Sequence, residues 1–134
     1  NHARYITSRS GHLLLFDDSW KMGKEKIVIK TGGGHVLVLN DQRGSESIAL
    51  YDSSGEEFLY FDEVRQKITL ESTNGDIDIR CPNGTLTVEA DKIVTKAAST
   101  AEHEAGDRMS HTSPEVIIEG FAKVDIDGGM IELN

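Results

Sequence analysis

The 134-residue sequence predicts an all-β fold whose core is completed only when three chains pack around a shared axis. Two patterns predict the strands. Apolar and polar residues alternate with period two, as in "KIVIK" at 26–30, and a glycine-centred unit of about 20 residues repeats along the first half. A third observation predicts the trimer: each unit carries one apolar rank that a single chain cannot cover by itself.

The first part, residues 1–80, is predicted to consist of glycine-turn repeats in the order strand, glycine turn, strand, acidic turn. The second strands follow the glycines as "HLLLFDD", "HVLVLND", "EEFLYFDE" and "DIDIRC". In three units, apolar residues stand seven and five positions before the glycine: Ile27 and Ile29, Ile48 and Leu50, Ile68 and Leu70. We assign structural turns to the four glycines, which are 23, 21 and 20 residues apart: Gly11, Gly34, Gly55 and Gly75.

The middle part, residues 81–115, is predicted to be narrower. After Gly84 the repeat shortens, and "TLTVEADKIVTK" still alternates. The alanines and glutamates of Ala97 to His111 suit either a short helix or a strand. We favour a strand because period two persists there, and the small residues of one side suit a narrow shaft: Thr95, Ala97, Ser99 and Ala101.

The last part, residues 116–134, returns to clear alternation and is predicted to form the C-terminal tip. Its apolar residues are Val116, Ile118, Val124, Ile126, Met130, Ile131 and Leu133.

A homotrimer follows from the single apolar rank and the small residues of the middle part. Stacking within one chain would make a solenoid, which needs larger residues to fill its own interior. Three chains around one axis would fill a narrow shaft, and each chain is then expected to bond its backbone to the other two along nearly its full length. The acidic surplus would lie on the outward face.

Composition restricts the possible partners. Asp and Glu outnumber Lys and Arg by 23 to 14, for a formal charge of −9, which argues against binding nucleic acid. The single cysteine, Cys81, rules out an intrachain disulfide. Neither a membrane-spanning stretch nor a signal-peptide core is present, and because the sequence opens without Met we expect upstream domains.

Several stretches resemble the C-terminal shaft of VgrG-type spikes of contractile injection systems, namely "TSRSGHLLLFDD", "KTGGGHVLVLND", "KITLESTNGDIDIRC" and "SPEVIIEGFAKVDIDGGMIELN". The resemblance covers nearly the whole chain. It implies a homotrimeric, intertwined triple-stranded β-helix or β-prism that acts as a membrane-puncturing needle in type VI secretion, a phage tail or an extracellular particle. It also implies assembly in the bacterial cytoplasm and action outside the cell.

The resemblance further implies a set of partners. Besides its own copies, these are a baseplate hub and tube reached through upstream domains, and transiently the target envelope. A PAAR-type tip protein would dock on the C-terminal residues, Gly128, Gly129, Met130, Ile131, Glu132, Leu133 and Asn134. The alternative function is a trimeric fibre stalk for a receptor- or glycan-binding module.

Catalysis, a cofactor and a metal are not predicted. "TGGGH" lacks the Lys-Ser/Thr of a phosphate-binding loop and precedes a strand. "DIDGG" lacks the later ligands of a calcium loop, and Cys81 has no histidine partner. Some phage spikes hold a tip iron on a His-x-His pair that this chain lacks. The eight-residue gap from His103 to His111 fits no usual zinc pairing, although a ring of three His103 side chains on a trimer axis stays an alternative.

Overall fold

A computed structural model describes residues 2–19 and 23–132 of the chain. It forms two units, which divide between Leu86 and Thr87. Within the described ranges the structure is all-β, with no helix.

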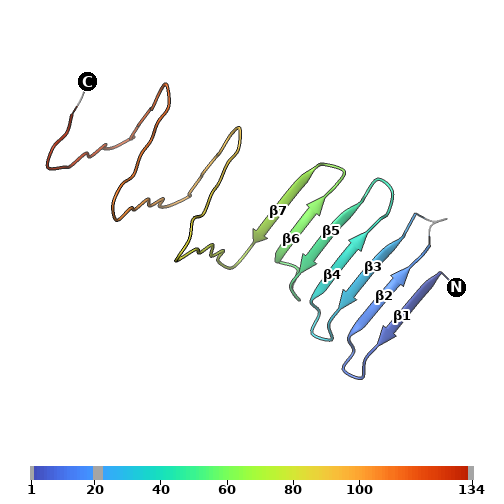
Figure 1. The fold of residues 1–134 in the computed structure, drawn as a ribbon. Helices are drawn as coiled ribbons and strands as arrows, with labels where there is room; N and C mark the ends of the chain where they lie inside the picture. The colour runs from blue at the N-terminus through green and yellow to red at the C-terminus, as the bar shows by residue number, and fades with distance from the viewer. Residues whose placement is uncertain (1, 20–22, 133–134) are drawn as a thin grey trace. The chain divides into compact units, whose positions relative to one another are not determined.

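The first unit contains seven short strands (Figure 1). They are rich in Ile, Val, Leu, Phe and Tyr, which fit a pleated surface. Their bounds are β1 Ala3–Thr7, β2 Leu13–Asp17, β3 Lys26–Lys30, β4 Val36–Asn40, β5 Ser47–Tyr51, β6 Glu57–Asp62 and β7 Lys67–Ser72.

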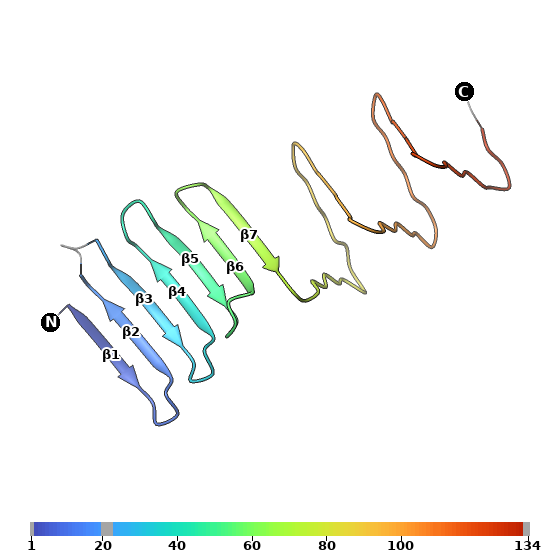
Figure 2. The same cartoon turned by 180° about the vertical axis from the view of Figure 1, so that it is seen from behind.

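The seven strands form one open antiparallel sheet in the order β1 to β7, each paired with its neighbour in the chain. Figure 2 shows the same meander from behind. The expectation of backbone bonding between chains along nearly the full length is therefore wrong for strands β2 to β6, each of which is paired on both sides within the chain. These strands pair inside the chain because short hairpin loops bring consecutive strands together at the smallest loss of chain entropy.

The glycine turns follow β1, β3, β5 and β7 and therefore lie at the same end of the strands. In the first two, a backbone bond closes the hairpin, from Ser8 N to His12 O and from Thr31 N to His35 O, both at 2.9 Å. Gly11, Gly34 and Gly55 have φ values of 82°, 99° and 78°, the left-handed region that favours glycine. Gly75 is different: it lies in a bend after β7, has no such φ, and donates its N–H to Ser72 Oγ at 3.1 Å.

No described residue beyond Ser72 belongs to a strand, so the strands predicted at 76–80, 85–96 and 97–111, and the one predicted at 116–133 as far as residue 132, are absent from the single chain. A strand requires a ladder partner. The last backbone–backbone hydrogen bond joins Gly84 N to Cys81 O at 3.4 Å, and the described residues after it make none. The short helix considered for Ala97 to His111 is absent too.

Along the sequence after Ser72, extended runs nevertheless alternate regularly with bends. Bends lie at 82–84, 91, 98–99, 106–107, 113–114, 121–122 and 129, so that successive bends begin seven to nine residues apart. We call residues 76–132 the tail. Its straight runs are 76–81, 85–90, 92–97, 100–105, 108–112, 115–120 and 123–128.

Almost nothing in the chain is buried. Ala49, 3% exposed, is the one buried hydrophobic residue among those described, and every residue from Thr73 to Glu132 is exposed. The chain exposes 12549 Å² of accessible surface, whereas a compact monomer of this mass would expose about 6900 Å². The fold of one chain therefore lacks a second layer to cover it.

Candidate functional site

The most prominent feature of the sheet is one face covered by apolar side chains, which we call the apolar face. Residues opposite one another on paired strands share a face, so the register defines two rows that run across all seven strands. The first row is Arg4, Phe16, Ile27, Leu39, Ile48, Phe61 and Ile68, and the second is Ile6, Leu14, Ile29, Leu37, Leu50, Leu59 and Leu70.

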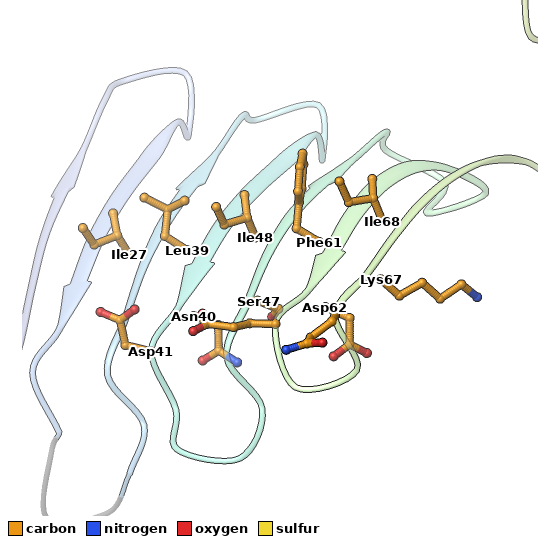
Figure 3. Close-up of a pocket in the computed structure, with 12 residues that line it drawn as sticks. Ile27, Leu39, Asn40, Asp41, Ser47, Ile48, Phe61, Asp62, Lys67 and Ile68 are labelled. Carbon is orange, nitrogen blue, oxygen red and sulfur yellow. The ribbon is translucent and has the colours of Figure 1, made fainter. Parts of the chain in front are cut away.

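Arg4 is thus the one polar residue of the two rows, and it lies on the terminal strand β1. The side chains of Ile27, Leu39, Ile48, Phe61 and Ile68 rise side by side from the sheet and line a shallow hollow (Figure 3). Polar residues occupy the margin of this hollow nearest the acidic turns, among them Asp41 and Asp62.

The apolar face is open to solvent in the single chain. Ile6, Leu50 and Ile68 are 67%, 51% and 65% exposed. A sheet stabilises itself by burying such a face against another layer, and seven strands with 13 large apolar side chains on one face offer a large area to bury. The face therefore has the character of an obligate protein interface.

The opposite face of the sheet is mixed. Its central row is Tyr5, Leu15, Val28, Val38, Ala49, Tyr60 and Thr69. Polar residues such as Lys26, Asn40, Ser47, Asp62 and Lys67 flank this row on one side. On the other side, the rings of Tyr51 and Phe58 pack at 5.8 Å between centroids. The centre of this face is therefore largely apolar, and its charged and amide side chains are concentrated in the row beside it.

The tail repeats the same two-sided pattern in most of its straight runs. Its second and fourth positions are aliphatic in most runs, for example Ile77 and Ile79, or Val124 and Ile126. Side chains two apart on an extended chain share a side, so each of these runs has one apolar side and one polar side. The runs are built like strands but have no partner among the described residues.

A second glycine in the "TGGGH" turn, which the sequence analysis missed, controls how neighbouring turns approach. A Cβ at Gly32 would lie 2.3 Å from the carbonyl oxygen of Ser10 in the preceding turn. Gly32 also donates its N–H to Nδ1 of His12 at 3.1 Å. The turn has a single position with positive φ, Gly34, and so requires only one glycine. The two additional glycines in the sequence were the sign of a further constraint.

The third turn is organised by Asp52. Its carboxylate accepts hydrogen bonds from the Ser54 hydroxyl at 2.6 Å and from the backbone amides of Ser54, Gly55 and Glu57 at 2.8 to 3.2 Å. These bonds, the hydroxyl first, hold the pKa of Asp52 far below its ordinary value. Desolvation, and then the nearby Asp52 charge, raise the pKa of Glu57.

Two other acidic turn residues also have lowered pKa values. A hydrogen bond from the Ser19 hydroxyl lowers the pKa of Asp17. At Asp62 the backbone amide of Arg65 contributes most, followed by the Arg65 guanidinium, each at 2.9 Å. Hydrogen bonds within the turns are the main cause of the three lowered pKa values, which gives these three aspartates a structural role.

The residues predicted to dock a tip protein lie at the end of the tail. A bend is centred on Gly129, Met130 is 79% exposed, and Ile131 is 52% exposed. Gly128 and Glu132 are described with them, whereas Leu133 and Asn134 lie outside the described residues.

The described part of one chain contains no group of three or more His, Cys, Asp or Glu residues that could hold a metal ion. Cys81 is exposed as a free thiol, and His35 engages its turn through its backbone N–H, which donates to Thr31 Oγ1 at 3.0 Å. No helix able to cross a membrane occurs in the two described ranges.

No family model matches the chain, and no curated protein matches it either.

Proposed function

We propose that this chain is the shaft of a homotrimeric central spike of a contractile injection system, a mechanical rather than catalytic component. The resemblance to VgrG-type shafts suggests it, and the unpaired tail is the observation that carries it. From residue 85 to residue 132 the chain is regular and extended, yet it makes no backbone–backbone hydrogen bond. An extended course without such bonds is what strands would show before their ladder partners are added, and in this proposal other copies of the chain supply those partners.

The regular bends indicate how those partners would be arranged. In this proposal a chain that bends after every five or six residues would wind around an axis, and three straight runs would complete one triangular turn. Two further copies, displaced by one strand spacing each, would fill the space between successive turns and pair every run on both sides. The tail would thus become an intertwined triple-stranded β-helix.

The sheet would take part in a different way. Its strands already pair within the chain, and three sheets would turn their apolar faces toward the axis as the walls of a prism. The mixed faces and the acidic turns would then lie outside, where a charge of −9 per chain keeps the particle soluble. A closed, three-walled rod with few free strand edges suits the transmission of thrust into a target envelope.

The end of the tail would receive the tip. Exposed Met130 and Ile131 follow the bend at Gly129 and would form a small apolar platform on the trimer end. A PAAR-type cone protein would seat there and carry the effector, while hub and tube would attach upstream.

Deletion of Gly129 to Asn134 tests the docking site. The truncated chain, co-expressed with a PAAR-type protein, should lose its association in a pull-down while still sedimenting as a trimer. The matched control is Asp125→Asn, a polar change on the side of the last run opposite Val124 and Ile126, which should retain the association. Full association of the truncated trimer would show that the tip protein docks elsewhere.

A further inference from the structure

We propose that three chains together build an axial binding site for a divalent first-row transition-metal ion from His103 and His111. This inference rests on the proposed trimer. It concerns the middle of the tail, far along the chain from the C-terminal residues assigned to tip docking.

The bends place the two histidines at equivalent positions. Numbering each straight run from its first residue, the fourth positions are Ile79, Val88, Thr95, His103, His111, Ile118 and Ile126. Four of these seven residues are branched aliphatics and one is threonine. His103 and His111 therefore interrupt an apolar rank in two consecutive runs.

Alternation within each run indicates the side on which the two histidines lie. In 100–105, "TAEHEA", His103 shares its side with Ala101 and Ala105, and the charged Glu102 and Glu104 belong to the other side. In 108–112, "RMSHT", His111 shares its side with Met109. Both histidines thus fall on the small or apolar side, which would face the axis of the trimer.

Threefold symmetry would place three copies of each histidine around the axis, one from each chain, and we call each set of three a ring. Consecutive runs of one chain would differ in height by one strand spacing, about 4.8 Å, so the rings of His103 and His111 would be adjacent layers. Six imidazoles would then converge on the axis. The eight-residue gap that fits no zinc pairing within one chain equals the offset between the starts of these two runs, at residues 100 and 108, so each chain would contribute one histidine to each ring.

The six imidazoles indicate which class of metal ion the site would bind. Six imidazoles inside a narrow apolar channel would leave their ring nitrogens without partners, which is costly unless something binds them. Neutral imidazole is a favoured ligand for Zn²⁺, Ni²⁺, Cu²⁺ and Fe²⁺. No carboxylate shares the side of either histidine in these two runs, so hard cations such as Ca²⁺ and Mg²⁺ lack the oxygen ligands they need.

Zinc content of the purified trimer tests the site. The full chain would be stripped with chelator, exposed to Zn²⁺, desalted and measured by elemental analysis, with sedimentation of the same sample. The test variant is the double substitution His103→Thr and His111→Ile, which copies Thr95 and Ile118 from the neighbouring runs and should preserve assembly. His35→Glu is the control, since that residue lies in a turn of the first unit.

We expect wild-type and His35→Glu trimers to retain Zn²⁺. The Zn²⁺ content of the double variant should be at least about tenfold lower, since even changes outside the ligand shell reduce metal affinity that much. A wild-type trimer that retains no more Zn²⁺ than the double variant overturns the metal site and leaves the proposed function intact. A wild-type chain that sediments as a monomer overturns both.

Discussion

At the scale of single residues, the three glycines of "TGGGH" have different roles. Gly32 permits close approach to Ser10, and Gly34 has φ 99° with Ser53 Cβ 3.3 Å from where its own Cβ would stand. Gly33 has neither constraint, since a Cβ there would meet nothing closer than Thr31 Oγ1 at 3.9 Å. The sequence alone pointed to a turn here but could not separate these roles, because approach between turns depends on how the hairpins stack.

Substitutions at these three positions should therefore differ. We expect Gly33→Ala to leave the thermal unfolding midpoint nearly unchanged. Gly32→Ala should lower it because of the backbone clash, and Gly34→Val should lower it and impair assembly because left-handed backbone strain costs about 1 to 3 kcal/mol per chain. His35→Glu, copying Glu56 of the next unit, should be tolerated. Circular dichroism melts measure all four, and equal midpoints for the Gly32 and Gly33 variants would refute the assigned roles.

Asp52 makes the third turn sensitive to acid. Because its pKa is depressed in the folded chain, the unfolded chain takes up the proton first as pH falls below the ordinary aspartate value of 3.8. The stabilisation from Asp52 is therefore present above that pH and is lost progressively below it. Asp17 and Asp62 act in the same direction, whereas the raised pKa of Glu57 acts in the opposite one.

Asp52→Asn should lower the unfolding midpoint near neutral pH and flatten its decline below the aspartate pKa. Thermal unfolding followed at a series of pH values measures both effects. Asp41→Asn is the comparison, because no hydrogen bond to the Asp41 side chain is found in the described structure. An equally steep acid decline in the Asp52 variant would contradict the role assigned to this carboxylate.

At the scale of elements, substitutions on the two faces of β5 distinguish an effect on assembly from an effect on folding. Ile48 belongs to the apolar face, and the adjacent Ser47 lies on the opposite face between Asn40 and Asp62. In the proposed trimer a lysine at position 48 would bury an unpaired charge, at a cost of about 3 to 5 kcal/mol per chain. A lysine at position 47 would remain solvated beside a carboxylate.

We expect Ile48→Lys to abolish the trimer and Ser47→Lys to retain it. Size-exclusion chromatography coupled to light scattering gives the mass of each variant directly. If Ile48→Lys remains trimeric with wild-type stability, the apolar face is not the surface that faces the axis.

The sequence predicted the sheet better than it predicted the tail. The apolar pairs seven and five residues before Gly34, Gly55 and Gly75 fall in the two rows of the apolar face, because period two maps directly onto the faces of a strand. Gly75 copies the spacing of the other glycines but lies in a bend without positive φ, since β7 has no following strand in the chain to pair with. The same lack of partners explains why the alternating tail forms no strands.

At the scale of the whole molecule, the accessible surface area of the chain is much larger than that of a compact monomer of the same mass. It exposes 12549 Å², against about 6900 Å² for a compact protein of the same mass. Two features account for the excess: the uncovered apolar face, and a tail whose every described residue is exposed. Two further copies of the chain would cover both, which is why we propose a trimer rather than an independent domain.

Sedimentation equilibrium of the full chain, in dilute solution and with Ile48→Lys as the dissociated reference, tests the trimer most directly. The account predicts a single species at three times the 14.7 kDa of one chain, unchanged as the protein is diluted. A folded species at 14.7 kDa, with the same circular dichroism spectrum as the most concentrated sample, would contradict it.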